Sequence, residues 1–294
     1  MTQLLSPEFE RYGVTVWMKR EELNHPLIQG NKWHKLKLNI EAALKVEKKC
    51  LLTFGGAYSN HIAATAAAAK FIGLGSIGII RGQELADQPE KWSHTLIEAV
   101  ANGMQLEFIS RADYRDKASP LAIQQLQQRY PDAYLIPEGG SNELAVRGFD
   151  HLLNQIETQC PDWSHLITAV GTGGTLAGLT RSAPIKDNRQ IYGIPVLKQG
   201  DFLLPAIQSW IDNQLTNDWQ LFTEYHCGGY AKTTPDLLKR MQQFETEFGI
   251  KLDPVYTAKM VNAVYELLSK KQFKPGSKIV LLHTGGLQGC SAKI

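Results

Sequence analysis

Short apolar runs alternate with amphipathic segments along this chain. The apolar runs predict strands at Leu51–Phe54, Ser76–Arg81, Gln105–Ser110, Tyr134–Pro137, Leu166–Val170, Ile191–Val196 and Lys278–His283. Helical periodicity predicts helices at Lys35–Lys45, Asn60–Phe71, Ser93–Ala101, Leu144–Ile156, Pro235–Phe248 and Ala258–Ser269. Most of the strand runs are typical of parallel strands buried on both faces. The pattern therefore predicts an α/β fold in which helices cover a mainly parallel sheet.

Length and charge narrow the classes of partner. With 294 residues, the chain can form one large domain or two interleaved ones. Its 31 basic and 29 acidic residues give a net charge of +2 without a long basic run, so we expect no nucleic-acid partner. The N-terminus lacks the pattern of a signal peptide, and the apolar stretch Ile62–Leu74 falls short of the roughly 20 residues that cross a bilayer. We expect a cytoplasmic protein that does not bind membranes.

The four cysteines, Cys50, Cys160, Cys227 and Cys290, are widely scattered. None forms a C-x-x-C pair or lies near a pair of histidines, so the sequence predicts reduced thiols and no metal site.

Glycine-rich turns follow three of the predicted strands, at the ends where open α/β sheets bind ligands. The first turn, Gly55–His61, leads into an alanine-rich helix for which Ser59 is a good N-cap. Free N–H groups and the helix dipole at such a start favour a carboxylate or a phosphate. An ordinary capped helix is the alternative interpretation.

The second turn, Gly171–Thr175, combines three glycines with two threonine hydroxyls, which suits backbone amides closing on a phosphate. It lacks the G-K-[ST] ending of a Walker loop, and Leu176 stands where a dinucleotide fingerprint needs its third glycine. A single monoester phosphate therefore fits it better than ATP or NAD, and a plain turn is the alternative. The third turn is His283–Gly286.

Lys32 follows a glycine and an asparagine at a predicted helix start. The positive end of the helix dipole should lower the pKa of its amine, and such an amine can form a Schiff base. Local sequence alone does not separate Lys32 from a solvated surface lysine.

Several distant segments, taken in order, resemble the set that marks pyridoxal-phosphate enzymes of fold type II. More narrowly, they resemble the branch that contains D-cysteine desulfhydrase and 1-aminocyclopropane-1-carboxylate deaminase. The resemblance runs from about Val16 to Gly286. The segments that carry it are Lys19–Glu22, Asn31–Lys32, Ser59–His61, Pro137–Ser141, Gly171–Thr175, Leu252–Tyr256 and His283–Gly286.

The resemblance implies pyridoxal 5′-phosphate as cofactor and two open, mainly parallel sheets covered by helices, like the tryptophan synthase β chain. It implies that Lys32 holds the cofactor covalently and that Asn60 hydrogen-bonds its ring hydroxyl. The phosphate would be held by Gly171, Thr172, Gly173, Gly174 and Thr175. The substrate carboxylate would be received by Ser59, Asn60 and His61. The candidate catalytic residues are Lys32, Ser59, Tyr230 and Tyr256, and Thr257 is a candidate for substrate binding.

Thr284 is implied to face the pyridine nitrogen of the cofactor. A neutral hydroxyl there does not enforce protonation of the ring, which leaves a weaker electron sink. Such a site should favour eliminations over reactions that need a long-lived carbanion.

The expected reaction is an α,β-elimination on a small D-amino acid. From D-cysteine, the amine of Lys32 or a nearby tyrosine would take the α proton, and the products would be pyruvate, hydrogen sulfide and ammonia. The alternative is a deaminase that gives 2-oxobutanoate and ammonia from 1-aminocyclopropane-1-carboxylate. Deaminases of the branch resemble this chain but carry a glutamate and a leucine where Thr257 and Thr284 stand, so both threonines favour the desulfhydrase.

The chain departs from the branch at several positions. Gln29–Gly30 replaces the usual glycine pair, Trp33 and His34 stand in place of threonine and arginine, and His61 replaces a common glutamine. Trp33 and His34 adjoin the lysine, so we expect that pocket shape and substrate could differ from both named activities.

The resemblance also implies a large cofactor-binding domain formed by residues 1–36 and 148–294, a small inserted domain at 37–147, and a homodimer. Two other classes remain open. One is a protein that binds a phosphate ligand without covalent chemistry, and the other is a catalytically silent relative.

Overall fold

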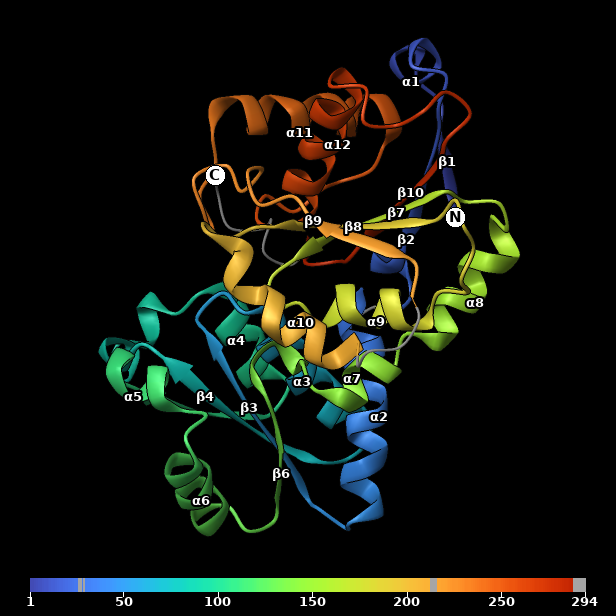
Figure 1. Cartoon of the computed structure of the whole chain (residues 1–294). Helices are drawn as coiled ribbons and strands as arrows, with labels where there is room; N and C mark the ends of the chain where they lie inside the picture. Colours follow the sequence, from blue (N-terminus) through green and yellow to red (C-terminus); the bar gives the residue numbers. More distant parts are fainter. Residues whose placement is uncertain (26–27, 29, 212–215, 288–294) are drawn as a thin grey trace.

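A computed structural model of the chain describes residues 1–25, 28, 30–211 and 216–287, which form two separate sheets. The four-stranded sheet lies in the lower half of the molecule and the six-stranded sheet in the upper half (Figure 1). The predicted α/β class with two mainly parallel sheets is confirmed.

The six-stranded sheet joins the N-terminus to the C-terminal half of the chain. Its only antiparallel pair among the described residues is β1 with β2 at one edge, and the other pairs are parallel. In spatial order its strands are β1 (Thr2–Leu4), β2 (Thr15–Arg20), β10 (Lys278–His283), β7 (His165–Val170), β8 (Gln190–Pro195) and β9 (Asp218–Leu221).

The four-stranded sheet is parallel throughout and comes from one continuous part of the chain. In spatial order its strands are β5 (Met104–Ile109), β4 (Gly75–Arg81), β3 (Cys50–Gly56) and β6 (Ala133–Ile136). The carboxyl ends of β3 and β4 are in register, with Gly56 opposite Arg81, so the turns that follow them meet at one edge.

Helices connect successive parallel strands. The α-helices are α1 (Pro7–Arg11), α2 (Asn31–Lys45), α3 (Asn60–Phe71), α4 (His94–Ala101), α5 (Arg111–Asp116), α6 (Pro120–Arg129), α7 (Glu143–Arg147), α8 (Asp150–Gln159), α9 (Gly174–Ser182), α10 (Leu204–Ile211), α11 (Pro235–Phe248) and α12 (Thr257–Ser269). Short 3-10 helices are η1 (Glu21–Leu23), η2 (Gln83–Leu85), η3 (Pro89–Lys91), η4 (Glu138–Gly140) and η5 (Gly200–Leu203). None of the described helices is long and apolar enough to cross a membrane.

Strand β7 contributes side chains to two hydrophobic clusters, one on each face of its sheet. Ile167 and Ala169 pack in the cluster that contains the buried side chains of α11 and α12. Leu166 and Val170 pack in the cluster that contains those of α8, α9 and α10. Because alternate side chains of a strand point to opposite faces, a strand covered on both faces is apolar at most positions.

All seven predicted strands are present, but sequence periodicity missed β1, β2 and β9. β1 and β9 are short edge strands, and β2 ends in charged residues although Val16 and Met18 are fully buried. The single helix predicted for Leu144–Ile156 is two helices, α7 and α8, which are separated at Gly148. A Cβ on Gly148 would lie 2.1 Å from the carbonyl oxygen of His34, so this residue lies tight against α2.

Candidate active site

The start of α2 is pressed against the turn that follows β10. Gly30 is the N-cap of α2, and its φ of 67° is in the left-handed region. A Cβ at this position would lie 1.9 Å from the carbonyl oxygen of Thr284. The N–H of Asn31 donates to the same oxygen at 3.4 Å. Two segments more than 250 residues apart in sequence are thereby held side by side.

Lys32 is linked by hydrogen bonds to the glycine-rich turn after β7. Its Nζ donates to Asn31 Oδ1 at 2.8 Å, and Asn31 Nδ2 donates to Thr175 Oγ1 at 2.8 Å. Burial lowers the pKa of Lys32 to about 8, against the opposing effect of the Asp253 charge. The expected direction of the pKa shift is confirmed, although burial, and not the helix dipole, is its principal cause.

Lys32 opens into a cavity of about 580 Å³ between the two sheets. We call its two sides the six-strand wall and the four-strand wall. The six-strand wall includes Gly171, Thr172, Gly173, Thr175, Tyr230, Tyr256 and Thr284. The four-strand wall includes Gly56, Ala57, Tyr58, Ser59, Asn60, His61, Arg81, Glu138 and Gly139. The predicted site residues thus converge on one cavity, except for Gly174 and Thr257.

The turn Gly171–Thr175 leads from β7 into α9, whose N-cap is Gly173. Gly174 is the first residue of α9 and is buried behind the turn. A Cβ on Gly174 would lie 2.7 Å from Ser141 Oγ and 3.4 Å from Lys35 Nζ. The backbone therefore comes close to a buried ammonium group at a helix N-terminus, which is a suitable place for an anion.

Lys35 is the buried cation at this turn, and sequence reasoning did not assign it a role. Its side chain lies one helical turn after Lys32, and its Nζ donates to Gly139 O at 3.0 Å and to Ser141 Oγ at 2.9 Å. Thr172 Oγ1 lies 3.5 Å away. Burial and the neighbouring charge of Lys32 hold the pKa of Lys35 well below its usual range. The i, i+3 spacing of two lysines at a helix start was the signal that could have found it.

Ser59 occupies the position that the sequence predicts, as N-cap of α3. Its Oγ accepts the N–H of Ile62 at 3.4 Å. Asn60 and His61 form the first turn of α3 and line the cavity beside it. The side-chain Nδ2 of Asn60 lies close to Gly286, because a Cβ added to that glycine would be 2.5 Å from this nitrogen. The helix start therefore faces the cavity with the polarity that favours a carboxylate.

The side chain of His61 is directed toward Thr53 of β3. Thr53 Oγ1 donates to Ile136 O at 2.9 Å, so it accepts from His61 Nε2, which is 2.8 Å away. This fixes the tautomer with the proton on Nε2, and the buried Nδ1 has no hydrogen-bond partner among the described residues. Burial, followed by the charges of Lys32 and Lys35, lowers the pKa of His61 well below 6.5. A neutral ring with this tautomer cannot donate from Nδ1 to a carboxylate, so only the backbone of His61 suits that role.

Tyr230 and Tyr256 lie together in the six-strand wall, with ring centroids 6.2 Å apart and ring planes at 74°. Burial, with smaller effects of Tyr230, Asp253 and Glu138, raises the pKa of Tyr256 well above 10. The hydroxyl of Tyr256 therefore keeps its proton at neutral pH. Thr257 does not reach the cavity, because it is fully buried and its Oγ1 donates to Asp253 Oδ2 at 2.7 Å. Its expected contact with substrate is not supported by this placement.

Trp33 and His34 point away from the cavity. Trp33 stacks on His25 with ring centroids 5.2 Å apart, and His34 Nε2 lies 2.6 Å from Glu21 Oε2. Neither residue lines the cavity, and the expectation that they alter pocket shape and substrate stays a prediction. Gln29 and Cys290 lie outside the described residues, whereas Cys50, Cys160 and Cys227 are free thiols.

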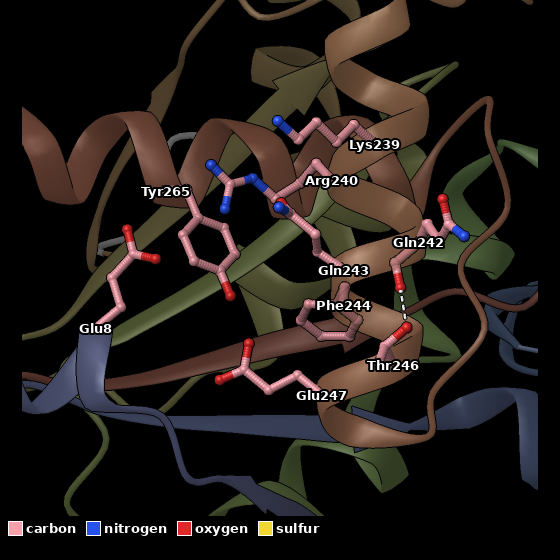
Figure 2. Close-up of a pocket in the computed structure, with 9 residues that line it drawn as sticks. All are labelled: Glu8, Lys239, Arg240, Gln242, Gln243, Phe244, Thr246, Glu247 and Tyr265. Carbon is pink, nitrogen blue, oxygen red and sulfur yellow. Dashed lines mark hydrogen bonds between the residues drawn. The ribbon is translucent and has the colours of Figure 1, made fainter.

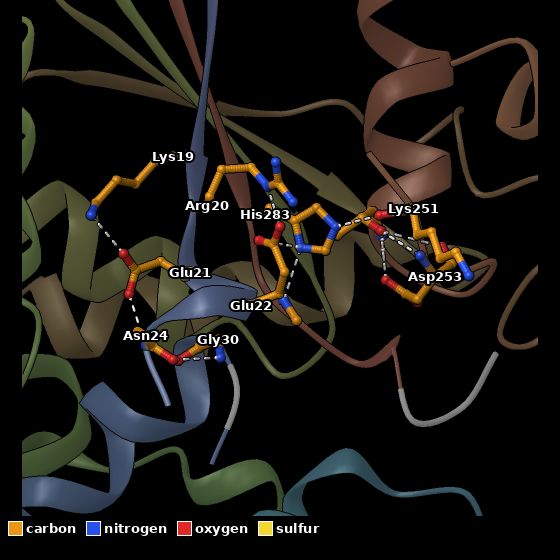
Figure 3. Close-up of polar contacts among 11 residues, drawn as sticks. Lys19, Arg20, Glu21, Glu22, Asn24, Gly30, Lys251, Asp253 and His283 are labelled. Carbon is orange, nitrogen blue, oxygen red and sulfur yellow. Dashed lines mark hydrogen bonds and ion pairs between the residues drawn. The ribbon is translucent and has the colours of Figure 1, made fainter. Parts of the chain in front are cut away.

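An ion-pair network behind the cavity contacts Gly30 through Glu21, and Glu22 of the same network lies beside His283 (Figure 3). Lys19 Nζ lies 2.8 Å from Glu21 Oε1, and the backbone oxygen of Glu21 accepts the N–H of Gly30 at 2.9 Å. Glu22 Oε2 lies 3.1 Å from Nδ1 of His283, the residue before Thr284. Burial raises the pKa of Glu21, but hydrogen bonds and charges of His34 and Lys19 outweigh it and bring the pKa to about 2.

Arg81 and Glu138 line the mouth of the cavity and were not among the predicted site residues. Arg81 is the last residue of β4, and its position at a strand end was the available signal. Glu138 accepts from the hydroxyl of Tyr114 at 2.6 Å and pairs with Lys117 at 3.0 Å.

A second hollow, of about 610 Å³, lies between α1, α11 and α12 (Figure 2). Its side chains are mostly polar and exposed, and the guanidinium of Arg240 lies 4.0 Å from the ring centroid of Tyr265. None of the predicted site residues lines it. The cavity around Lys32 is therefore the candidate active site.

The residues of this cavity fit pyridoxal phosphate. The aldehyde needs an amine with a lowered pKa, which Lys32 supplies. The phosphate needs a concentrated anion site, which the Gly171–Thr175 turn and Lys35 supply on the same cavity. The start of α3 remains for a substrate carboxylate.

Comparisons with known proteins agree with this geometry. Residues 1–285 match the family described as "Pyridoxal-phosphate dependent enzyme". The chain is 29% identical to the bifunctional D-cysteine desulfhydrase/1-aminocyclopropane-1-carboxylate deaminase of Arabidopsis thaliana. This match covers 96% of this chain and 75% of that protein. It is 30% identical to a putative 1-aminocyclopropane-1-carboxylate deaminase of Pyrococcus horikoshii, and this match covers 94% of this chain and 86% of that protein. A solved structure of an ACC deaminase homologue superposes with a TM-score of 0.83 at 27% identity, covering 98% of this chain and 89% of that one.

Proposed function

We propose that this chain, which belongs to the pyridoxal-phosphate-dependent enzyme family, is a lyase that eliminates hydrogen sulfide from D-cysteine. The observation that carries the proposal is the hydrogen-bonded path from Lys32 through Asn31 to Thr175. This path places a reactive amine and a phosphate-type turn on one cavity. Relatives named as D-cysteine desulfhydrase and as 1-aminocyclopropane-1-carboxylate deaminase support the reaction class.

Each wall has a proposed role. Lys32 would hold the cofactor, and Asn60 would contact its ring hydroxyl. Lys35 and the residues Gly171, Thr172, Gly173, Gly174 and Thr175 would hold its phosphate, and Thr284 its ring nitrogen. Ser59, Asn60 and the backbone of His61 would receive the substrate carboxylate.

The bound cofactor supplies an electron sink for the α carbon of the substrate. The pKa of about 8 makes the amine of Lys32 a competent base for the α proton near neutral pH. Tyr256 keeps its proton, so we assign it to donation toward the departing sulfur and not to proton removal. With one water, D-cysteine yields pyruvate, hydrogen sulfide and ammonia.

A deaminase is the second candidate. The chain differs from the deaminase pattern at Thr257 and Thr284, and the buried hydroxyl of Thr257 is held by Asp253, where it cannot replace a glutamate that reaches the substrate. This observation favours the desulfhydrase.

The assembly proposed with this function is a homodimer in the cytoplasm. The proposed domains are residues 1–36 with 148–294, and 37–147. The segregation of the strands supports this division, because β3 to β6 all lie between residues 50 and 136. Molecular mass in solution and limited proteolysis test the two proposals.

The test begins with the visible spectrum of the purified protein mixed with pyridoxal phosphate. We expect an absorption band near the visible range that borohydride removes and that Lys32→Ala lacks. Pyruvate and sulfide should then be released from D-cysteine. Release of 2-oxobutanoate from 1-aminocyclopropane-1-carboxylate alone would favour the deaminase, and a colourless wild-type protein would favour a non-catalytic phosphate-binding relative.

A further inference from the structure

The segment that brings Tyr230 into the cavity has an unusual backbone. Cys227, Gly228, Gly229 and Ala231 have φ values of 49°, 91°, 113° and 53°. Non-glycine residues in this region cost of the order of 1 kcal/mol each or more, and they persist only where the surrounding structure holds them. We call residues 227–231 the tyrosine loop.

Lys259 of α12 is hydrogen-bonded to the tyrosine loop. Its side chain is fully buried on α12, and its Nζ donates to Gly229 O at 2.6 Å and to Val196 O at 3.5 Å. Burial lowers the pKa of Lys259, while Cys227 and Asp253 oppose the shift. A buried ammonium group is costly unless its donors are satisfied. Here its described hydrogen bonds go to backbone carbonyls, one of which adjoins Tyr230.

The same helix start positions the other tyrosine. Tyr256 is the N-cap residue of α12, and Asp253 Oδ1 accepts the N–H of Tyr256 at 2.7 Å. Lys259 follows it by three residues, which is one helical turn. The start of α12 therefore acts on the cavity in two ways. Tyr256 lines the cavity directly. Lys259 donates a hydrogen bond to the carbonyl of Gly229, the residue before Tyr230.

We propose that Lys259 is a positioning residue that fixes Tyr230 against Tyr256 by tethering the tyrosine loop to α12. Lys259 is absent from the cavity lining and does not reach the substrate position. Its effect on the reaction passes through Tyr230, and this part of the inference rests on the proposed lyase function. The tether itself does not depend on that function.

The thiol of Cys227 reports on the tether in the protein without cofactor. Burial raises the pKa of Cys227, and the charge of Lys259 partly offsets this. In Lys259→Met, loss of the charge alone would raise the thiol pKa further and slow alkylation. Release of the loop would instead expose the half-buried thiol and speed alkylation. The two explanations therefore predict opposite signs.

The experiment is peptide-resolved alkylation by iodoacetamide at pH 8, with Cys50 and Cys160 as references in the same chain. We expect Cys227 of Lys259→Met to react about tenfold faster, as for loss of one charge-assisted hydrogen bond from a loop. The matched control is Lys270→Met, at the other end of α12, where Nζ donates to Tyr225 Oη at 2.9 Å. This control should react like the wild type. Slower or unchanged alkylation of Cys227 in Lys259→Met would overturn the tether.

A second variant covers the case in which Lys259→Met does not fold. Gly229→Ala leaves Lys259 in place but puts a Cβ at a φ of 113°, which L-residues rarely adopt. It should also speed alkylation of Cys227. If Gly229→Ala reacts like the wild type, the loop is not held in this conformation and the tether is overturned.

The catalytic arm uses the holoenzyme. We expect kcat for D-cysteine to fall about 10²-fold in Lys259→Met, as for small misplacements of a reacting group. Tyr230→Phe should lower kcat, and adding it to Lys259→Met should have little further effect, because both changes remove the same contribution. Full additivity would overturn positioning through Tyr230. If the wild type has no activity, the proposed lyase fails while the alkylation result still decides the tether.

Discussion

The two walls of the cavity are built in different ways. The six-strand wall consists of tight backbone turns that approach other segments closely, such as Thr284 against Gly30. The four-strand wall consists of a helix start and side chains at strand ends, including the exposed Arg81. A turn whose shape is fixed by its backbone suits a cofactor that stays bound. Side chains at the entrance of the cavity can differ between relatives that act on different substrates. The difference indicates why relatives in one family share a cofactor and differ in the reaction that their names describe.

Lys35 connects the two walls. Its ammonium group binds Gly139 O on the four-strand wall and lies 3.5 Å from Thr172 Oγ1 on the six-strand wall. The proposed phosphate site is therefore the place where a side chain contacts both walls.

Breaking the six-strand wall should have the largest effect. Gly30→Ala adds a Cβ at a φ of 67°, 1.9 Å from Thr284 O, and this neighbour is backbone that cannot rotate away. We expect about 2–6 kcal/mol of lost stability, from strain and overpacking together. Urea denaturation measures it. The control is Gly73→Ala, because Gly73 has a φ of 74° and nothing within 4 Å of an added Cβ. Equal losses in both variants would show that the contact with Thr284 adds nothing.

Replacing Lys35, which contacts both walls, should weaken cofactor binding without unfolding the protein. We expect Lys35→Met to raise the Kd for pyridoxal phosphate by about 10- to 100-fold, the loss of a hydrogen bond to a charged group. The protein without cofactor should lose about 1–3 kcal/mol of stability, because Gly139 O and Ser141 Oγ lose a buried donor. Spectroscopic titration measures Kd. Lys37→Met, at an exposed position of the same helix, should bind like the wild type. Unchanged Kd in Lys35→Met would assign the phosphate elsewhere.

Sequence reasoning predicted the glycine-rich turns better than the contacts of single side chains, for a physical reason. Glycines and hydroxyls at a strand end have a meaning that does not depend on distant residues, so the turn at Gly171–Thr175 could be predicted locally. The tautomer of His61 is set by Thr53 and, through it, by Ile136 of another strand. Lys259 gained its significance only from the path of the tyrosine loop. Such contacts depend on packing that periodicity does not encode.

The fold shows the same limit. Apolar runs buried on both faces were predicted within one or two residues, as at β7. The missed strands β1 and β9 lie at sheet edges, where only some positions are buried. β2 carries charged residues that the ion network behind the cavity neutralises, so its sequence resembles an exposed segment.

The pH dependence of cofactor capture tests the electrostatics that the walls create around Lys32. Burial lowers the pKa of Lys32 to about 8, and only the unprotonated amine attacks an aldehyde. Capture should therefore become faster as pH rises through about 8, by roughly tenfold between pH 7 and 9, and then level off. A solvated lysine would keep gaining up to its ordinary pKa of about 10.4. Stopped-flow absorbance gives the rate, and a free lysine derivative corrects for titration of the aldehyde. A rate still rising at pH 10 would contradict the buried placement.

The smallest effect is expected at the four-strand wall, where Ser59 is an N-cap and has a separate, proposed role in substrate binding. As N-cap of α3 its Oγ accepts the N–H of Ile62, so Ser59→Ala should cost about 1 kcal/mol of stability. Ser119→Ala removes an equivalent cap from α6, where Oγ accepts the N–H of Ala122 at 3.2 Å, and should cost a similar amount. Only Ser59→Ala should also raise KM for D-cysteine, because only its helix start faces the cavity. If KM stays the same in both variants while stability falls equally, Ser59 is a cap and the carboxylate is bound by other groups.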